Sequence, residues 1–405
     1  MLAHHGFEQT RDSSAEFVVL NTCTVTNTAD TEVRQIVRRV HRENPDARIV
    51  VTGCYAQRAP EEIAQLPGVA LVVGNSHKTQ IADLMSAPYH GQIHVGDIFE
   101  ARDFLSSPVE DASGDRSRPN LKIQDGCGNR CSFCIIPFVR GRSRSAPVAQ
   151  IVDQVRSLSE RYPEVVLTGI NLGRWGREAG FGMRLVDLLR LLLVDTDVRR
   201  LRLSSVEPMD WSDELLQFVA REDRIAKHIH IPLQSGSDAV LRRMHRRYRP
   251  KHYEARVRLA RELMPDAAIG ADVMVGFPGE TEEEFEQTCA FVETMPFTYL
   301  HIFPYSERPG TPAAERPDQV PESVRKDRGR ILRQIGLRKN AEFRRGFMGR
   351  TLSAVTIENG RAITSNYLAI EMSSARPARM MVNIRIGSVT EAGLREWTAF
   401  PVLSS

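Results

Sequence analysis

The sequence lacks the features that carry a protein into or across a membrane. No run of about 18 or more apolar residues occurs, and the longest apolar stretch, residues 188–194, is interrupted by Arg190. The first residues also lack the basic segment followed by an apolar segment that marks a secretory signal. We therefore expect a cytoplasmic protein with no membrane partner.

Cysteine, aromatic residues and net charge are also scarce. The 405 residues include 6 cysteines and 7% aromatic residues, and 54 basic against 51 acidic residues leave a net charge of +3. So small a net charge says little about an acidic partner. Because the cytosol keeps thiols reduced, few cysteines in a long chain predict metal or redox chemistry rather than disulfides. The remaining composition, 41% hydrophobic and 26% charged, is typical of a globular protein with two or three domains.

The first part of the chain predicts a parallel α/β domain over residues 1–105. Runs of β-branched residues at 16–21, 48–53 and 70–74 alternate with segments of helical periodicity. This alternation is typical of a βαβαβ unit. Residues 106–119 are rich in Ser, Pro, Asp and Gly and carry no periodicity, so they predict an interdomain linker.

A second α/β alternation predicts a barrel domain over residues 120–345. Helical patterns separate six apolar strand segments, at residues 121–125, 165–169, 199–205, 228–233, 269–277 and 298–305. Six such units fit a complete or partial barrel better than a flat sheet, although a doubly wound sheet has a similar pattern. Residues 346–405 instead alternate Thr, Val and Ile with Gly and Asn turns, which predicts a small all-β module.

Three of the cysteines lie close together in the segment DGCGNRCSFCIIP, directly after the first predicted barrel strand. Cys127, Cys131 and Cys134 follow the pattern C-x-x-x-C-x-x-C. Three thiolates at this spacing hold three irons of a 4Fe-4S cluster and leave the fourth iron open to another ligand. The alternatives are a zinc knuckle and a chance spacing of cysteines, but a structural zinc takes four protein ligands and no fourth lies nearby in the sequence.

With Phe133 before the last cysteine, this segment resembles the radical S-adenosylmethionine enzymes. The resemblance implies a barrel of six units, with S-adenosylmethionine on the open iron and its cleavage to a 5′-deoxyadenosyl radical that abstracts hydrogen. Active sites of such barrels lie at the carboxyl ends of the strands. The candidate cofactor contacts are Phe133 and, at predicted strand ends, Thr168, Gly169, Ser205, Glu207, Gln234, Ser235 and Gly276. Each residue at a strand end also fits an ordinary turn.

Further segments narrow the resemblance to the methylthiotransferases, which insert sulfur into a C–H bond and methylate it. These segments are residues 21–30, 51–57, 228–244 and 272–285, and residues 346–405 resemble a TRAM RNA-binding domain. The first segment, together with the cysteine segment, is most similar to the branch that methylthiolates C2 of N6-threonylcarbamoyladenosine beside the tRNA anticodon. The isopentenyladenosine branch and the branch acting on a ribosomal-protein aspartate are the alternatives. The partners implied are tRNA, S-adenosylmethionine, and an unidentified reductase and sulfur donor.

Two more cysteines belong to the first domain. Cys23 and Cys54 each follow a predicted strand, so both thiols are expected at one carboxyl edge of the parallel sheet, where open α/β sheets bind ligands. Two small buried residues at strand ends are the simpler alternative. The resemblance implies a second, auxiliary 4Fe-4S cluster at this edge, held by three cysteines and bearing or delivering the sulfur.

The third of those cysteines is expected in a segment ahead of Met1. Residues 1–5 have the pattern of a helix end, and Gly6 matches its C-cap, so the strand and helix that should precede them are absent. We expect a truncated start. One alternative is a substitute ligand such as His4 or His5, and another is a chain that binds tRNA and one cluster without transferring sulfur.

Two histidines and two basic segments have two interpretations each. His228 and His230 share one face of a barrel strand, either as buried hydrogen-bonded residues or as cofactor contacts. The basic segments 241–261 and 325–345 are either solvated helix faces or contacts for tRNA phosphates. The resemblance also implies RNA contacts in the last module, for which the candidates are Arg361, Asn366 and Tyr367.

Overall fold

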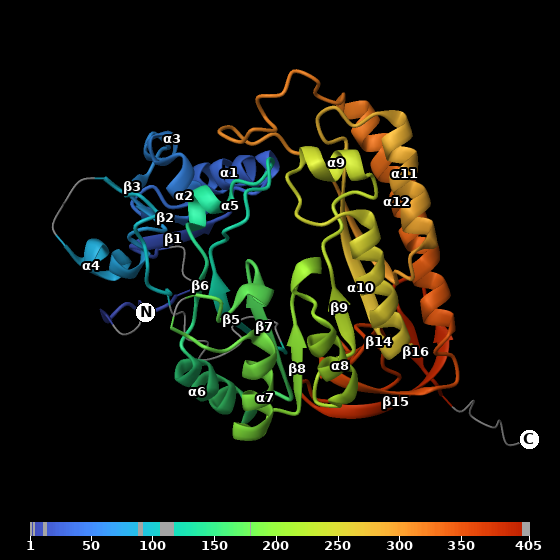
Figure 1. Cartoon of the computed structure of the whole chain (residues 1–405). Coiled ribbons are helices and arrows are strands. Elements are labelled where there is room, and N and C mark those ends of the chain that lie inside the picture. The colour runs from blue at the N-terminus through green and yellow to red at the C-terminus, as the bar shows by residue number, and fades with distance from the viewer. Residues whose placement is uncertain are drawn as a thin grey trace, which may run out of the picture. The chain divides into compact units, whose positions relative to one another are not determined.

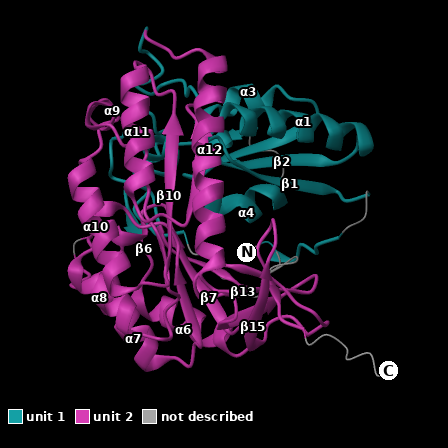
Figure 2. Ribbon diagram, turned by 90° about the vertical axis from the view of Figure 1, so that its right-hand side faces the viewer, with its two compact units in different colours: residues 1–107, 125–144, 306–317 teal, residues 108–124, 145–305, 318–405 magenta. Residues whose placement is uncertain are grey.

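The computed structural model describes residues 2, 5–10, 14–87, 92–105, 117–178 and 180–398. The chain folds into two compact units, coloured separately in Figure 2. Unit 1 comprises residues 1–107, 125–144 and 306–317, and unit 2 comprises residues 108–124, 145–305 and 318–405. The domain limits 1–105, 120–345 and 346–405 stay a prediction. Most of the expected linker, residues 106–116, lies outside the described residues, as do Met1, Ala3 and His4.

Unit 1 contains a four-stranded parallel sheet in the order β1-β2-β3-β4, which confirms the predicted parallel α/β domain (Figure 1). Its strands are β1 (Phe17–Thr22), β2 (Arg48–Gly53), β3 (Val69–Gly74) and β4 (Ile93–His94). Its helices are α1 (Asn27–Glu43), α2 (Cys54–Arg58), α3 (Pro60–Ala64), α4 (Ile81–Ser86), α5 (Ile136–Arg140) and the 3-10 turn η2 (Lys78–Gln80). Apolar side chains explain the order, because β2 is buried over its last five residues and lies in the middle of the sheet.

Helix α1 begins at its residue Asn27 because the Thr26 side chain accepts a hydrogen bond from the Ala29 backbone N–H. Val33 and Val37, one turn apart, face the sheet and pack in one cluster with Ile49 of β2. The last turn of the helix contains His41 and Arg42 ahead of its final residue Glu43, and basic side chains there favour the negative end of the helix dipole. Cap and apolar stripe therefore fix the position of the turn that follows β1.

Unit 2 contains the barrel strands, and six of them lie where the sequence predicts. Strands β5 (Asn120–Asp125), β7 (Glu164–Gly169) and β8 (Arg200–Leu203) form parallel pairs, with the short β6 (Arg144–Ser145) at the edge of their sheet. Strands β9 (His228–His230), β10 (Ala268–Val275) and β11 (Tyr299–Pro304) form the second parallel sheet. Strand β9 is shorter than predicted and ends at His230, because the next residues lead into the turn around Gln234.

Helices separate these strands, as a barrel of βα units requires. They are α6 (Val148–Ser159), α7 (Leu185–Asp195), α8 (Asp213–Arg221), α9 (Asp238–Arg243), α10 (Pro250–Leu263), α11 (Glu282–Thr294) and α12 (Glu322–Arg345), with 3-10 turns η3 (Leu172–Arg174) and η4 (Pro208–Asp210). None of the described helices combines the length and the apolar composition that crossing a bilayer requires.

The chain ends in a small closed β-barrel, which confirms the predicted all-β module. Its strands are β12 (Thr351–Ile357), β13 (Arg361–Thr364), β14 (Ala369–Glu371), β15 (Met381–Val389) and β16 (Leu394–Glu396), in the order β12-β13-β14-β16-β15. A core of its own includes Ile370, Ile384 and Leu394. Closure leaves no strand of this barrel as an open edge.

Buried ion pairs join this small barrel to the amino ends of the unit 2 strands. Glu164, the first residue of β7, has a fully buried side chain and contacts the guanidinium groups of Arg118, Arg200 and Arg202. Arg202 also donates to the backbone oxygens of Thr364 and Ser365. Burial raises the pKa of Glu164, but the arginines outweigh it and hold that pKa at about 2.

Candidate functional site

Cys23 and Cys54 lie at the same edge of the unit 1 sheet. Thr22 and Gly53 are register partners on β1 and β2, and the two cysteines are the residues that follow them. Neighbouring strands lie about 4.8 Å apart, so the two residues leave the sheet side by side. Asn75 follows β3 at the same edge of the sheet, and its side-chain amide nitrogen lies 3.7 Å from the Cys54 sulfur. The structure therefore brings both predicted cysteines together.

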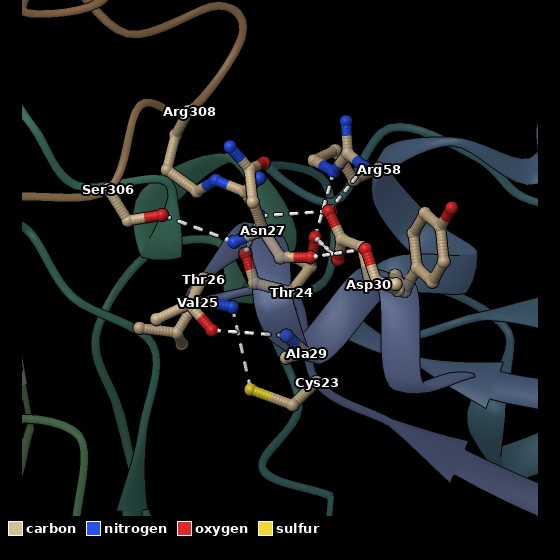
Figure 3. A network of polar contacts seen from close by, with 12 residues as sticks. Cys23, Thr24, Val25, Thr26, Asn27, Ala29, Asp30, Arg58, Ser306 and Arg308 are labelled. Carbon is tan, nitrogen blue, oxygen red and sulfur yellow. Dashed lines mark hydrogen bonds and ion pairs between the residues drawn. The ribbon is translucent and has the colours of Figure 1, made fainter. Parts of the chain in front are cut away.

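A network of buried charges fixes the turn that carries Cys23 (Figure 3). The Thr24 hydroxyl donates to Asp30 at 2.6 Å, and Arg58 donates both to that hydroxyl and to the Asp30 carboxylate. Arg308, with a side chain only 2% exposed, donates to the Thr24 carbonyl and to Asp30 at 2.9 Å. Because a buried carboxylate needs charged partners, the turn after β1 is held from two directions.

Helix α5 covers Cys54 within the same unit. Cys54 packs with Ile135 and Val139 in one apolar cluster, and Nε of Arg140 lies 3.0 Å from the Cys54 sulfur. Asn75 also donates to the Val139 carbonyl at 2.8 Å, which ties the sheet edge to the helix. Burial lowers the pKa of Arg140, but Cys54 and Asp125 outweigh it and raise that pKa above its ordinary value. A guanidinium cation therefore faces the Cys54 sulfur.

The three-cysteine loop leaves β5 through a glycine. Gly126 has φ +69°, and a Cβ there would lie 2.0 Å from the Arg142 carbonyl, so no other residue fits the turn. Cys127 donates to the Gly141 carbonyl, and the Asn129 backbone N–H lies 3.4 Å from the Cys127 sulfur. All three thiols and Phe133 are partly buried and lie in unit 1.

This loop fits an iron-sulfur cluster. Its donor set is three thiols within eight residues, and a backbone N–H already points at one of the sulfurs, as thiolates bound to iron commonly accept. Cys134 donates its backbone N–H to the Cys131 carbonyl at 3.1 Å, which closes the turn between the second and third cysteines. The loop therefore presents thiols on an ordered backbone.

The predicted cofactor contacts at the strand ends separate into two groups. Thr168 and Ser205 both line a cavity of about 470 Å³ inside unit 2, together with His228 and His230. The Ser205 hydroxyl hydrogen-bonds Nδ1 of His230 at 2.6 Å. The structure thus places two of the predicted residues and both histidines at one cavity.

Glu207 and Ser235, two of the remaining predicted contacts in unit 2, have partners of their own. Glu207 pairs with Arg246 at 2.5 Å, and the Ser235 hydroxyl hydrogen-bonds Thr288 at 3.1 Å. Gln234 has φ +67°, and its side-chain oxygen is buried without a hydrogen-bond partner among the described residues. Gly169 lies against the Gln124 side chain, where a Cβ would approach to 2.9 Å.

Gly276 can be tested as a turn residue. Its φ is +68°, and a Cβ there would lie 2.1 Å from Cγ of Arg325. We expect Gly276→Ala to lower the stability of unit 2 by about 2–4 kcal/mol, because the left-handed backbone and the clash both oppose the methyl group. The midpoint of thermal unfolding, followed by circular dichroism, measures this loss.

The matched control is Gly349→Ala. Gly349 has φ +76° in the same unit, but nothing lies within 4 Å of its Cβ position. It should therefore show only the backbone cost, about 1–2 kcal/mol. Equal losses in the two variants would contradict the role given to Arg325.

Aromatic rings line part of the same cavity. His228 stacks on Tyr367 with ring centroids 4.5 Å apart, and its Nε2 lies 2.7 Å from the Tyr299 hydroxyl. Burial, and then the charge of Arg202, lower the pKa of His228 well below its ordinary value. His228 is therefore a neutral ring in a hydrogen-bonded stack, the first of the two interpretations the sequence left open.

Several arginines of the two basic segments bind partners inside the protein. In α12, Arg328 pairs with Glu280 at 2.8 Å and Arg344 donates to backbone carbonyls near residue 390. In the segment 241–261, Arg243 pairs with Glu284 and Arg261 donates to three carbonyls. Charge density in the sequence therefore overstates the surface open to phosphates. Asn366 is likewise an internal residue, which donates to the Asp266 carbonyl at 2.9 Å.

Sequence reasoning missed the residues that support the cysteines. Asp30, Arg58 and Arg308 surround the turn after Cys23, and Arg140 contacts Cys54, but none of the four carries a spacing signal. In the sequence Asp30 looks like an ordinary acidic residue in the first turn of a helix, because its burial is seen only in the structure.

Comparison with known families agrees with this geometry. Residues 121–292 match the family described as Radical SAM superfamily, which spans the three-cysteine loop and five of the six strands. Residues 1–74 match the family described as uncharacterized protein family UPF0004, which contains Cys23 and Cys54.

Several enzymes of named function align with most of this chain. The threonylcarbamoyladenosine tRNA methylthiotransferase MtaB of Aquifex aeolicus is 39% identical over 382 residues, 93% of this chain and 92% of that protein. The protein of the same name from Bacillus subtilis is 44% identical over 80% of this chain and 71% of its own length. The tRNA-2-methylthio-N(6)-dimethylallyladenosine synthase of Acetivibrio thermocellus is 30% identical over 96% of this chain and 84% of that protein.

Solved structures resemble the fold. The radical S-adenosylmethionine methyltransferase TsrM of Kitasatospora setae, with cobalamin and a 4Fe-4S cluster bound, superposes with a TM-score of 0.57 at 18% identity. The superposition covers 74% of this chain and 66% of that one. A second structure of TsrM, with tryptophan and an S-adenosylmethionine analogue, gives the same TM-score at 20% identity.

Proposed function

The chain belongs to the radical S-adenosylmethionine methylthiotransferases, and from that membership we propose that it adds a methylthio group to C2 of N6-threonylcarbamoyladenosine in tRNA. The observation that carries the proposal is the 39% identity to the Aquifex aeolicus enzyme over 93% of the chain. A tRNA substrate is found in the cytoplasm, which is therefore the compartment we propose. The electron donor and the sulfur source are partners still to be identified.

Membership of the radical S-adenosylmethionine superfamily implies a 4Fe-4S cluster and S-adenosylmethionine. We propose Cys127, Cys131 and Cys134 as the ligands of that cluster, because they are three thiols on one ordered loop. Such a cluster with S-adenosylmethionine bound would supply the radical chemistry that removes a hydrogen atom from the base. The residues of the loop would hold the sulfurs of that cluster.

For the auxiliary cluster we propose Cys23 and Cys54 as ligands. Their support is the shared sheet edge, the positive Arg140 beside Cys54 and the charge network beneath Cys23. A guanidinium stabilises a thiolate, and thiolate is the form that binds iron. The two cysteines would position sulfur, and Arg308 and Arg58 would hold the turn that carries it.

An adenosine beside the anticodon suits an enzyme that acts on a base edge. Proteins that recognise RNA by sequence commonly take bases from single-stranded loops, where a base is splayed out of its stack. Phosphate contacts add affinity that depends on salt. Arg361, on β13 of the small barrel, stays our proposed contact of this kind, and Tyr367 is partly exposed in the same barrel.

The decisive experiment is mass spectrometry of tRNA nucleosides. These 405 residues are expressed under anaerobic growth in a host that lacks its own enzyme. We expect the 2-methylthio derivative of N6-threonylcarbamoyladenosine to appear. A methylthiolated ribosomal protein with unmodified tRNA would contradict the proposal.

Replacing both Cys23 and Cys54 by serine distinguishes the roles of the two proposed clusters. We expect the variant to release 5′-deoxyadenosine from S-adenosylmethionine while the methylthio nucleoside falls to background, because only sulfur transfer needs these thiols. Chromatography of the reaction products measures both. Full methylthiolation by the double variant would remove Cys23 and Cys54 from the reaction. Cys289→Ser, a substitution at a partly buried cysteine of α11, is the matched control and should retain both products.

A second candidate substrate is N6-dimethylallyladenosine. The Acetivibrio thermocellus enzyme named for that nucleoside is 30% identical over 96% of this chain, compared with the 93% that the Aquifex aeolicus protein covers. The same nucleoside analysis distinguishes the two, because the two methylthio products differ in mass.

A further inference from the structure

Three metal-ligating side chains meet in the cavity of unit 2. His230 on β9, Asp272 on β10 and His301 on β11 each direct one ligand atom into a group whose members all lie within 4.8 Å of one another. Oδ1 of Asp272 lies 3.2 Å from Nε2 of His230 and 3.3 Å from Nδ1 of His301. All three residues line the cavity of about 470 Å³.

The register of the strands brings these residues to one face. Asp272 and His301 are direct partners on the parallel strands β10 and β11. His230 is the partner of Gly270, which lies two residues before Asp272 and so on the same face of β10. A Cβ on Gly270 would lie 2.0 Å from the Tyr299 ring, so the glycine leaves room for the side chains around it.

One nitrogen of this group is buried without a hydrogen-bond partner. Nε2 of His230 is close to Asp272 but not aligned for a hydrogen bond, and within the described residues no other partner reaches it. The residue is 7% exposed, so bulk water cannot compensate. Its other nitrogen, Nδ1, is held by the Ser205 hydroxyl at 2.6 Å. A hydrogen bond on one imidazole nitrogen is the usual way to fix the other as a metal ligand.

We propose that His230, Asp272 and His301 bind one divalent transition-metal ion of the zinc or ferrous type. Two imidazoles and one carboxylate are the donor set that such ions take in sites with open coordination positions. The cavity beside the three residues leaves space for those positions, and a water molecule or an oxygen or nitrogen atom of a substrate would fill them. The site uses none of the five cysteines assigned to clusters, and it does not depend on the tRNA activity.

Charges around the group permit a cation. Arg118 and Arg202 line the same cavity, but both are paired with the buried carboxylate of Glu164. Asp272 supplies a carboxylate oxygen, which only accepts when it is ionised and so suits a positive ligand.

The test uses the holoenzyme with its clusters reconstituted and Zn²⁺ alone as the probe. After incubation with Zn²⁺ and removal of the excess, we expect the protein to retain one more zinc per chain than the Asp272→Asn variant does. Zinc-edge X-ray absorption should show that this ion has only nitrogen and oxygen ligands at about 2.0–2.1 Å, with imidazole scattering. Sulfur at about 2.3 Å would assign the zinc to cysteines and overturn the proposal.

Matched variants keep the result interpretable. His301→Ala removes a ligand whose side chain is 60% exposed, so it should lose the zinc without loss of fold or of cluster iron. Ser205→Ala should weaken zinc binding about 10–100-fold because it frees the His230 ring. His252→Ala, at an exposed histidine of α10, should retain all the zinc. Equal zinc in the native protein and in both His301→Ala and Asp272→Asn would refute the site.

Discussion

Cys131→Ala should lose all release of 5′-deoxyadenosine from S-adenosylmethionine. Three thiols of one loop are the proposed cluster ligands, and a cluster held by two is not expected to survive purification. Anaerobic assay with dithionite as reductant, followed by chromatography, measures the product. The same result is expected for Cys127→Ala and Cys134→Ala, with loss of one cluster's share of the iron.

Cys289→Ala is the control for this series. Its thiol lies on α11, where burial raises the pKa to about 11, so it is a protonated thiol at neutral pH and is not poised to bind iron. It should retain both the iron and the product. If Cys131→Ala still released 5′-deoxyadenosine at a substantial rate, the assignment of the loop would be wrong.

Glu164→Gln should destabilise unit 2 by about 3–5 kcal/mol. The substitution keeps the shape of the side chain but leaves Arg118, Arg200 and Arg202 without their carboxylate in a buried site. The loss should appear as a lower urea midpoint at neutral pH. Because Arg200 and Arg202 also bind the small barrel, that barrel should unfold together with the strands beneath it.

This effect has a defined pH dependence. The folded pKa of Glu164 is held at about 2, below the ordinary value of 4.5, so its stabilisation is fully present above about pH 4.5. It is lost as the pH falls from there to about 2, where the carboxylate takes up a proton. The difference between the native protein and Glu164→Gln should therefore shrink over that range.

Glu254→Gln, which removes an exposed i,i+4 pair with Arg258, should change stability by less than about 0.5 kcal/mol at any pH. A difference that stays constant down to about pH 2 would contradict this account.

Strands were predictable where burial on both faces makes the sequence itself apolar. The run at 48–53 coincides with β2, and the run at 165–169 matches β7 apart from its first residue, Glu164. A pattern of β-propensity does not predict a charged residue in a buried strand. Glu164 is stable there because three arginines far away in the sequence neutralise its carboxylate. Periodicity reports the neighbours of a residue on its own element and says nothing about partners of this kind.

The cysteines were predictable as a set, whereas their surroundings were not. The βαβ pattern makes the strands parallel, so the common edge of Cys23 and Cys54 could be derived without the exact register. The contact of Arg140 with Cys54 joins residues 86 positions apart through a short helix with no amphipathic pattern. The group of His230, Asp272 and His301 likewise depends on the register between three strands, which a single sequence does not specify.

The Asp30–Arg308 pair cannot form until most of the chain has been synthesised. The two residues are 278 positions apart, so at about 5–20 residues per second the ribosome needs roughly 15–60 seconds to deliver the arginine after the aspartate. Until then the turn bearing Cys23 lacks one of its two cations, and the segments 125–144 and 306–317 of unit 1 are incomplete. The turn that carries Cys23 therefore reaches its final contacts only after Arg308 has been synthesised, so iron that met the proposed ligands Cys23 and Cys54 before then would meet an incomplete site.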